Sequence, residues 1–418
     1  MNKQVYILAI LISFSCGGCE LDNHKNDNEI DDNNNNIELS VAGEQIVNAS
    51  NDFSFNIFSE FEAKYPDDNI FFSPLSISIA LSMSFNGGKG DTKNEIKEVI
   101  DFGSYSDKEI NEGFKFLQDE LSGLDENVKF SIANSAWYRQ DLSLLDNYKN
   151  ILFNYYYAEI EGLDFSDSNS KDTINEWIAE KTEDKIKNMI ERLDPATVLV
   201  LVNAIYFNGT WKYEFDEENT YTGIFNSFNN NNISCDFMKS GKIKTKYVCD
   251  NEKTLAVLPY GNGNFEMVLY MPKNVTDMAT VLSDLSANNF NSLYTGADED
   301  SIVVHLPKFK IETETISIRE MHQTLGMEIS FTPLADFSNI FGSGGVYIDD
   351  VLHKAFIDVN EEGTEAAAAT VVIFLRAVAD GEAEEKVFYF NKPFLFFIRE
   401  QSTGEILFAG KMINPVYN

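Results

Sequence analysis

The side chains that most often carry out catalysis are few in this chain, and their spacing matches no catalytic arrangement. Of the four histidines, His24 lies near the N-terminus, and His305, His322 and His353 are isolated from one another. There is no HExxH pair to hold zinc and no GxSxG turn to expose a nucleophilic serine. The glycines of Gly87–Thr92 are wrongly spaced for a phosphate loop and predict a turn. We therefore expect neither an enzyme nor a metal or cofactor site.

Two of the four cysteines, Cys235 and Cys249, lie in the body of the chain. They flank a predicted hairpin that turns near Gly241, and this turn would place them opposite each other on one face. In an oxidising compartment they would be able to form a disulfide. Two buried free thiols are the alternative, and we expect that state.

The segment Glu361–Val387 has an unusual pattern for an exposed stretch. Its Glu- and Ala-rich start favours a helix by local propensity. Small uncharged residues nevertheless follow Gly363 at alternate positions, and in an extended strand these would share one face. They are Thr364, Ala366, Ala368 and Thr370. Because the apolar run Val371–Leu375 would be costly to leave exposed, we interpret the segment as a strand whose stable place is inside a sheet.

Residues 1–19 have the pattern of a secretory leader. A short apolar core, Val5–Phe14, follows a positive start and is too short to span a bilayer comfortably. A small residue then precedes a cysteine, as in bacterial lipoproteins whose cysteine is acylated after cleavage. We predict Cys19 as the lipid anchor, with Cys16 as the alternative.

Residues 20–44 are rich in Asp, Asn and Glu and predict a disordered tether, because such a segment has little apolar surface to bury. From residue 45 to residue 418 the composition is even, and neither a linker nor an internal repeat interrupts it. We therefore expect one folded domain over 45–418. No second apolar stretch approaches the length of a membrane span, so the N-terminus is its only expected attachment.

The formal net charge is -35, from 67 acidic and 32 basic side chains. Such a surface repels phosphate and sulfate groups. The charge therefore argues against binding of nucleic acid and of heparin-like polyanions, and it favours solubility.

Helical periodicity dominates the first part of the domain, and strand patterns dominate the second. Helices are predicted around Phe53–Phe61, from Ser73 and over Ile174–Ile190. The continuous apolar run Leu199–Phe207 predicts a central strand that is covered on both faces. Further strands are predicted at Val128–Trp137, Phe265–Met271, Ile302–Leu306, Ala355–Val359, Phe394–Ile398 and Ile406–Phe408. Helices early and strands late, without regular alternation, favour an α+β fold.

Several ordered motifs over residues 48–418 resemble the serpin family. The most specific is Leu199–Trp211, which reads LVLVNAIYFNGTW. Others are NIFFSPLS at Asn69–Ser76, LPKF at Leu306–Phe309 and FNKPF at Phe390–Phe394. The resemblance implies the serpin fold, with three β-sheets, eight or nine helices and a reactive loop, at about 361–387, exposed near the C-terminus.

The resemblance also implies roles for particular residues. A shutter beneath the middle of the large sheet would consist of Ser73, Ser76, Asn203 and His353. Trp211 would lie at the top of that sheet, where loop insertion begins, although core packing alone would also explain Trp211 and His353. The hinge of the loop would consist of Glu361, Gly363, Thr364, Ala366, Ala368 and Thr370.

The implied activity is suicide inhibition of serine endopeptidases, with papain-like cysteine proteases as further targets. The protease would attack the loop, and the freed part of the loop would insert and trap the acyl-enzyme as a covalent 1:1 complex. A non-inhibitory serpin, acting as a carrier or decoy, is the alternative. The hinge favours inhibition, because non-inhibitory relatives tend to have bulky, charged or proline residues there.

The family's spacing from Glu361 places the reactive bond between Ala377 and Val378, which would suit elastase-like proteases. The bond between Arg376 and Ala377 is the alternative and would suit trypsin-like proteases. Phe374 or Leu375 would serve chymotrypsin-like enzymes. The return from Ala377 to the FNKPF motif is longer than is common, so this register stays open.

Taken together, these features predict a monomer that is held at the outer membrane or cell surface of a Gram-negative bacterium by its N-terminal lipid. An extracellular location is the alternative.

Overall fold

The helices lie mostly in the first half of the chain. The computed structural model describes residues 36–228, 232–273, 278–364 and 385–417, and within them it has ten α-helices where eight or nine were expected. Two of the ten, α9 and α10, have only six and four residues. The helices are α1 (Val41–Lys64), α2 (Pro74–Gly87), α3 (Gly90–Val99), α4 (Asp107–Leu121), α5 (Asp146–Tyr156), α6 (Asn169–Lys181), α7 (Met278–Ser283), α8 (Ala287–Thr295), α9 (Arg319–Thr324) and α10 (Ser338–Phe341).

Local sequence explains where several of these helices begin. Ser73 caps α2, because its Oγ accepts a hydrogen bond from the Ser76 amide at 3.2 Å, and Pro74 occupies the first helical position. Ser106 and Glu109 form a reciprocal capping box at the start of α4.

The helix predicted over Ile174–Ile190 is wrong in its second half, because α6 ends at Lys181. Glu183, Asp184 and Asn188 have positive φ angles, which a right-handed helix excludes. The Asn175 side chain also donates to the Ile190 carbonyl and accepts from the Ile190 amide, both at 2.8 Å. These two bonds fold the segment after α6 back onto the helix.

Three β-sheets are present among the described residues. The large mixed sheet has the order β1-β18-β17-β9-β8-β7-β10-β6-β5, with β16 also paired to β10. A six-stranded sheet has the order β11-β14-β15-β4-β2-β3, and β12 pairs with β13. The strands are β1 (Ile70–Phe72), β2 (Val128–Arg139), β3 (Glu159–Leu163), β4 (Leu199–Thr210), β5 (Tyr221–Asn226), β6 (Asn232–Lys239), β7 (Ile243–Cys249), β8 (Lys253–Tyr260), β9 (Phe265–Pro272), β10 (Asp298–Pro307), β11 (Phe309–Glu312), β12 (Ile316–Ser317), β13 (Leu352–His353), β14 (Phe356–Val359), β15 (Gly363–Thr364), β16 (Lys386–Tyr389), β17 (Phe394–Glu400) and β18 (Ile406–Met412).

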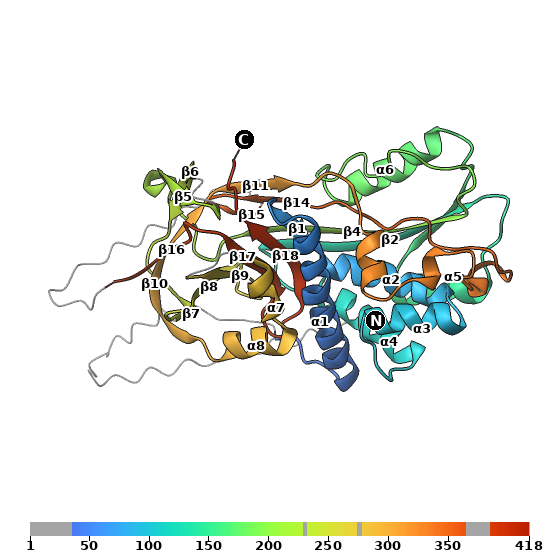
Figure 1. Cartoon of the computed structure of the whole chain (residues 1–418), viewed down its shortest axis with the longest axis horizontal. Helices are drawn as coiled ribbons and strands as arrows, with labels where there is room; N and C mark the ends of the chain where they lie inside the picture. Colours follow the sequence, from blue (N-terminus) through green and yellow to red (C-terminus); the bar gives the residue numbers. More distant parts are fainter. Residues whose placement is uncertain (1–35, 229–231, 274–277, 365–384, 418) are drawn as a thin grey trace, which may run out of the picture. The chain divides into compact units, whose positions relative to one another are not determined.

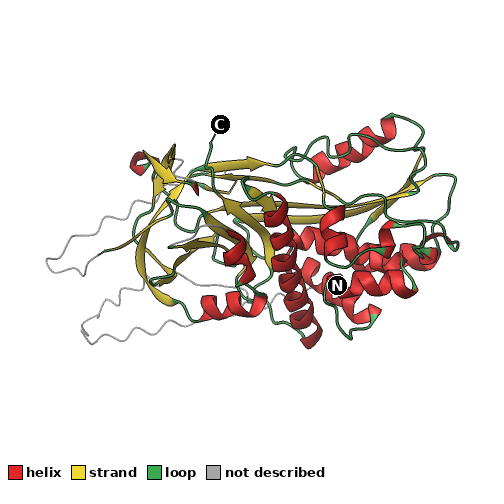
Figure 2. Ribbon diagram, viewed as in Figure 1, coloured by secondary structure: helices red, strands yellow, loops and turns green. Residues whose placement is uncertain are grey.

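The six-stranded sheet has helices on both of its faces (Figures 1 and 2). Helix α6 covers one face, where Trp177 packs edge-on against Trp137 of β2. Helix α2 packs against β4 on the other face. The prediction that Leu199–Phe207 forms a central strand is therefore confirmed, because β4 lies inside this sheet between β2 and β15.

The hairpin predicted between Cys235 and Cys249 is wrong. Strands β6 and β7 do not pair with each other but pair with successive stretches of β10. Cys235 lies opposite Gly223, whereas Cys249 lies opposite Thr254 of β8. Both cysteines are free thiols as expected, but they are not buried: Cys235 is half-buried and Cys249 is exposed. The turn near Gly241 therefore joins two strands that run along one neighbour, an arrangement that local alternation cannot distinguish from a hairpin.

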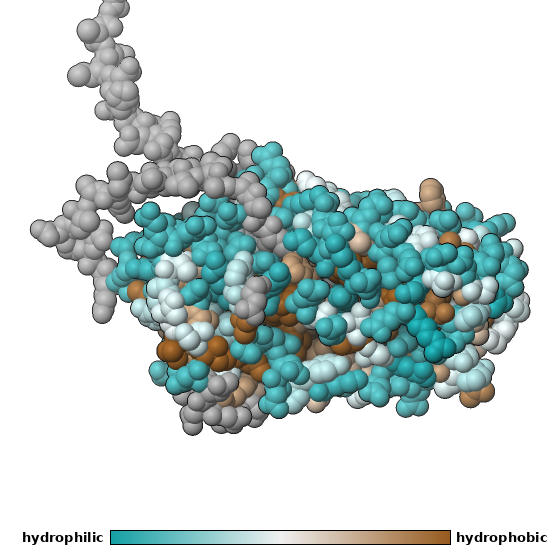
Figure 3. Space-filling model, turned by 90° about the horizontal axis from the view of Figure 1, so that it is seen from above, coloured by the Kyte–Doolittle hydropathy of each residue, from teal (hydrophilic) through white to brown (hydrophobic). Residues whose placement is uncertain are grey.

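The surface seen in Figure 3 is mostly hydrophilic, in keeping with the formal net charge of -35. Within the described ranges, no helix combines the length and the apolar character that crossing a membrane requires.

A gap in the six-stranded sheet as the candidate functional site

Strand β4 is paired along one edge but not along most of the other. On one side it pairs with β2 from Leu199 to Gly209. On the other side, within the described part of the chain, only Gly209 and Thr210 are paired, and their partner is the two-residue strand β15. Strand β14 meets β15 through a single pair, Val359 with Thr364. Below β15 the sheet therefore has a gap between β4 and β14.

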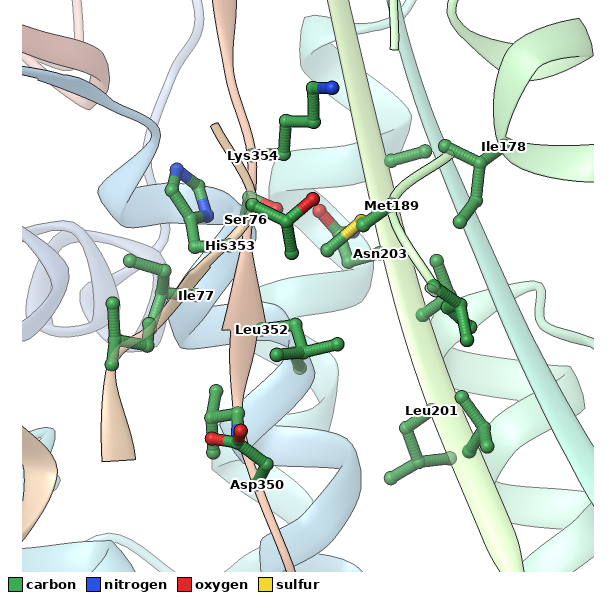
Figure 4. Close-up of a pocket in the computed structure, with 18 of the residues that line it drawn as sticks. Ser76, Ile77, Ile178, Met189, Leu201, Asn203, Asp350, Leu352, His353 and Lys354 are labelled. Atoms are coloured by element: carbon green, nitrogen blue, oxygen red, sulfur yellow. The ribbon is translucent and has the colours of Figure 1, made fainter. Parts of the chain in front are cut away.

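A cavity of about 800 Å³ lies at this gap. Strand β4 and the stretch Leu352–Ile357 line two of its walls, and α2 contributes Ser76 and Ile77. Residues from α6 and the segment that follows it, including Met189, complete the lining. Figure 4 shows Ser76, Asn203 and His353 around one part of this cavity.

The top of the gap is closed tightly around Gly363. A Cβ atom on this residue would lie 2.1 Å from the Gly209 carbonyl oxygen and 2.8 Å from the Thr210 Cα. Both contacts are to the backbone of β4, which cannot move aside as a side chain can. Only glycine therefore allows the chain to enter the sheet at this point.

Aromatic residues and a hydroxyl pair hold the next residue, Thr364, in the sheet. The Thr364 and Tyr260 hydroxyls are hydrogen-bonded at 2.5 Å, and both residues are buried. The Tyr260 ring stacks on Trp211 with centroids 4.3 Å apart, and Trp211 Nε1 donates to the Asn360 carbonyl at 2.9 Å. The structure thus places Trp211 at the top of the gap, beside the first residues of the hinge.

Glu361 precedes this entry point and has an ionic partner. Lys308 Nζ lies 2.6 Å from one carboxylate oxygen, and the Thr220 hydroxyl donates to the other at 2.7 Å. Burial opposes ionisation, but the hydrogen bonds from Lys308 and Thr220 outweigh it and lower the pKa of the Glu361 carboxyl. Glu361 is therefore held as a carboxylate that ties the hinge to the residue following β10.

Farther down, the cavity wall is polar but uncharged at its centre. The Ser73 amide donates to His353 Nε2 at 3.3 Å, and Ser73 Oγ donates to the Leu407 carbonyl at 2.7 Å. Burial and the nearby His322 lower the pKa of His353 to about 4. The imidazole is therefore neutral at neutral pH, so it presents no charge to the gap.

Asn203 on β4 faces His353 and Ser76 across this part of the cavity (Figure 4). Its amide nitrogen donates to Asn134 Oδ1 at 2.7 Å. Its own Oδ1 is buried and has no hydrogen-bond partner among the described residues. The four residues Ser73, Ser76, Asn203 and His353 all line the one cavity, although they come from α2, β4 and β13 and the residue before α2.

A contact across the outer face of the gap was not expected from the sequence. Lys354, next to β13, donates to the carbonyl of Lys187 in the segment after α6 at 3.0 Å. Lys185 of the same segment lies over the Phe356 ring at 5.0 Å. Neither contact has a local sequence signal, because both depend on the turn-back after Lys181. Lys308 belongs to the LPKF motif, but no role was predicted from the sequence for it or for Tyr260.

Several predicted residues lie outside the described residues: Cys16, Cys19, Ala366, Ala368, Thr370, Phe374, Leu375, Arg376, Ala377 and Val378. Glu361, Gly363 and Thr364 are the predicted hinge residues whose positions are known, and they meet at the entry to the gap.

Comparison with known proteins identifies this architecture. A family model described as "Serpin (serine protease inhibitor)" matches residues 48–415. Iripin-3 of Ixodes ricinus is 35% identical over 377 residues, which cover 88% of this chain and 94% of that protein. Intracellular coagulation inhibitor 2 of Tachypleus tridentatus is 36% identical over 353 residues, covering 82% and 85% of the two chains.

Among solved structures, human thyroxine-binding globulin in complex with its ligand superposes with a TM-score of 0.81 at 28% identity. The match covers 90% of this chain and 100% of that chain. The three sheets, the helices around them and the matched motifs agree with the α+β fold that the sequence predicts. The chain therefore belongs to the serpin family.

Proposed function

We propose that this serpin inhibits serine endopeptidases by inserting its cleaved reactive loop into the gap between β4 and β14. The observation that carries the proposal is β15. Gly363 and Thr364 already form the first two residues of a strand in that gap, antiparallel to both neighbours. The chain after them needs only to continue in the same direction to fill the gap.

The register of β15 predicts the contacts of the inserted loop. Gly363 faces Thr210 and Thr364 faces Gly209, so each later residue would face the preceding residue of β4. Continuing this pairing brings Thr370 opposite Asn203 and Phe374 opposite Leu199, where β4 begins. The pairing of Thr364 with Val359 similarly brings Thr370 opposite His353. The apolar end of the segment would thus reach the far end of the gap.

The alternation of small residues fits the same register. Thr364 points into the core, where its hydroxyl meets Tyr260. Because side chains two apart share a face, Ala366, Ala368 and Thr370 would point to the same side, toward α2. Small side chains would fill this part of the cavity without displacing Ser76 or His353.

Trapping follows from the order of events. The protease nucleophile would add to the carbonyl of the bait residue; the peptide C–N bond would break, and the amine would leave with a proton. The new ester, or thioester for a papain-like enzyme, joins the protease to the loop. Insertion would then bury the apolar run Val371–Leu375. Each fully buried side chain would stabilise the inserted state by about 1.5–3 kcal/mol. Insertion would displace the protease before water hydrolyses the ester.

We assign the reactive bond to Ala377–Val378, with Arg376–Ala377 as the alternative. The first would direct inhibition to elastase-like proteases and the second to trypsin-like proteases. The relative from Tachypleus tridentatus is named a coagulation inhibitor, which is in keeping with inhibition.

A carrier or decoy role is the second candidate, and one observation favours it. The structural neighbour is a globulin that binds thyroxine, and its match covers 90% of this chain. In that case the loop would be cleaved without trapping the protease. The absence of bulky, charged or proline residues at Thr364, Ala366, Ala368 and Thr370 favours inhibition over this role.

We further propose that acylation of Cys19, or of Cys16, holds the domain at a bacterial outer membrane by a flexible tether. Mass spectrometry of the N-terminal peptide from detergent-extracted protein tests this directly. A diacylglycerol adduct on either cysteine is expected, whereas an unmodified N-terminus beyond Cys19 would contradict it.

The inhibitory proposal is tested by mixing the purified protein with neutrophil elastase and, separately, with trypsin. We expect a 1:1 complex that survives denaturing electrophoresis and a released peptide that begins at Val378, or at Ala377 for trypsin. Clean cleavage by both enzymes without a complex would favour the carrier or decoy role.

A further inference from the structure

Three buried amide side chains form a continuous hydrogen-bonded chain that ends at the gap. Gln118 lies on α4, Asn134 on β2 and Asn203 on β4. Asn203 Nδ2 donates to Asn134 Oδ1 at 2.7 Å, and Asn134 Nδ2 donates to Gln118 Oε1 at 2.8 Å. Gln118 and Asn134 are 4% and 2% exposed, so water cannot replace either partner freely.

Backbone carbonyls determine which way the Gln118 and Asn134 amides point, and Asn134 then determines the direction of Asn203. Gln118 Nε2 donates to the carbonyls of Phe114 and Tyr155 at 2.9 and 3.0 Å. Asn134 Nδ2 also donates to the carbonyl of Tyr156 at 2.6 Å. Because a carbonyl can only accept, the nitrogen of each amide must face these groups, and its oxygen must face the next amide. Reversing any one of the three would bring two NH₂ groups or two oxygens together.

This polarity has a consequence at the gap. The Asn203 nitrogen is required by Asn134, so the Asn203 carbonyl oxygen is left on the other side of the amide. That atom is buried and has no partner in the described part of the chain. A buried acceptor without a donor is costly, and an inserting strand that brought a donor would remove this cost.

We propose that Asn134 and Gln118 are positioning residues for loop insertion, because they hold the Asn203 amide with its oxygen toward the gap. This inference rests on the proposed function and specifies which chemistry the gap accepts. The strand residue that arrives opposite Asn203 must donate a hydrogen bond. In the register set by Gly363 and Thr364 that residue is Thr370, whose hydroxyl is a donor.

The polarity is tested first in the intact protein with the N203D variant. A protonated carboxyl would reproduce the amide, since its O–H would donate to Asn134 Oδ1. An ionised carboxylate would place a second acceptor against Asn134 Oδ1, so the assigned polarity raises the pKa of the new carboxyl beyond the effect of burial alone. The opposite polarity would offer it an NH₂ group and would lower that pKa.

The measurement is the difference in thermal midpoint, Tm, between N203D and the unmodified protein from about pH 5 to about pH 9. A double variant, N203D with N134L, removes the acceptor Asn134 Oδ1. If the leucine substitution prevents folding, N134A takes its place. We expect this second substitution to shift the pH midpoint of the Tm difference down by about one unit. An upward shift would overturn the assigned polarity.

Two comparisons guard against other causes. The charged and titratable residues that also line the cavity are the same in all variants: Lys185, Glu191, Arg192, Asp194, Asp349, Asp350, His353 and Lys354. N208D, on the same strand but with its amide bonded to the Tyr206 hydroxyl, controls for a carboxylate on β4.

The role in insertion is tested by the gain in Tm on loop cleavage, measured in a fixed concentration of guanidinium chloride. Replacing Thr370 by Val should reduce this gain by about 2–4 °C, whereas replacing it by Ser should restore it. In an N203A background, the Val and Ser variants should not differ. Equal losses in both backgrounds would overturn the positioning role. If the unmodified protein shows no gain at all, the proposed function fails, while the pH midpoint of N203D still tests the polarity.

Discussion

The two ends of the gap in the six-stranded sheet differ in how they are closed. At the top, β15 fits so tightly that a single Cβ on Gly363 would collide with the backbone of β4. Lower down, the edges of β4 and β14 lie apart around a cavity of about 800 Å³. The upper end thus holds one short strand closely, whereas the lower end has a cavity lined by hydrogen-bonding groups.

The polar groups of the two ends differ in the same way. At the top, Glu361 has both Lys308 and Thr220, and Thr364 has Tyr260. Below, the Asn203 oxygen has no partner among the described residues. Polar groups that already have hydrogen-bond partners stabilise the existing arrangement. A buried polar group without a partner favours a rearrangement that supplies one. In the proposed mechanism, the top would fix where insertion begins and the lower part would supply part of the free energy for it.

The largest expected effect comes from Gly363→Val. Its Cβ cannot be accommodated against the Gly209 carbonyl, so β15 should leave the sheet and the loop should lose its starting register. We expect the rate of covalent complex formation with elastase to fall by a factor of at least about 100, which corresponds to about 2.7 kcal/mol. Gly241→Ala is the control, because its Cβ would meet nothing within 4 Å. An unchanged rate for the valine variant would contradict the tight closure of the top.

His353 in the lower part should make the protein sensitive to acid. Burial, with a contribution from His322, lowers its pKa to about 4, so the unfolded chain binds the proton more readily than the native state. Stability should therefore fall as pH drops from about 6.5 to 4, by up to about 3 kcal/mol from this residue.

The check is urea unfolding at several pH values for the native chain and for His353→Asn. The variant should lose part of the pH dependence in this window. His322, whose burial also lowers its pKa to about 4, should account for the remainder. An identical pH profile in the variant would contradict a neutral, buried His353.

Glu361→Gln removes the ionic interaction at the top of the gap but keeps a side chain of almost the same size and shape. The amide keeps a hydrogen bond with Thr220 but loses the ionic partner Lys308, at a cost of about 1–2 kcal/mol. Because the native pKa of Glu361 is lowered, this stability is present at neutral pH and is lost as pH falls through that pKa. We expect slower trapping and more spontaneous loss of inhibition on warming, measured as residual elastase inhibition after incubation. A variant as durable as the native chain would show that the ion pair does not hold the top.

The smallest effect is expected from Lys354→Ala, which removes the contact that crosses the gap to the Lys187 carbonyl. The intact protein should lose about 0.5–1 kcal/mol of unfolding free energy. Insertion should become slightly faster, because the segment after α6 loses its bond to the residue that follows β13. Stopped-flow fluorescence of a labelled protease reports that rate, and a slower insertion would contradict the crossing contact as an obstacle.

The α+β class followed from helical patterns early and strand patterns late, and the serpin fold followed from the family resemblance of motifs such as Leu199–Trp211. The same resemblance implied that Ser73, Ser76, Asn203 and His353 form one group, and the structure places them around one cavity. What local patterns could not predict depends on distant pairing. The β6–β7 arrangement needs β10, and the turn-back after Lys181 needs Asn175.

The amide chain from Gln118 to Asn203 could not be found from sequence for the same reason. Its members lie on α4, β2 and β4, and nothing in their spacing indicates contact. The tight fit at Gly363 likewise depends on the carbonyl of Gly209, more than 150 residues earlier in the chain. The family resemblance implied a hinge at Gly363, whereas the structure shows a steric requirement for glycine.

The most direct test of the central claim is backbone hydrogen exchange in β4 before and after the loop is cut by a protease that is not trapped. The account predicts that amides of Leu199–Val202 facing the gap become protected by a factor of at least about 100, because a new strand pairs with them. Unchanged exchange in Leu199–Val202 after complete cleavage would show that the loop does not enter the gap, and it would contradict the claim.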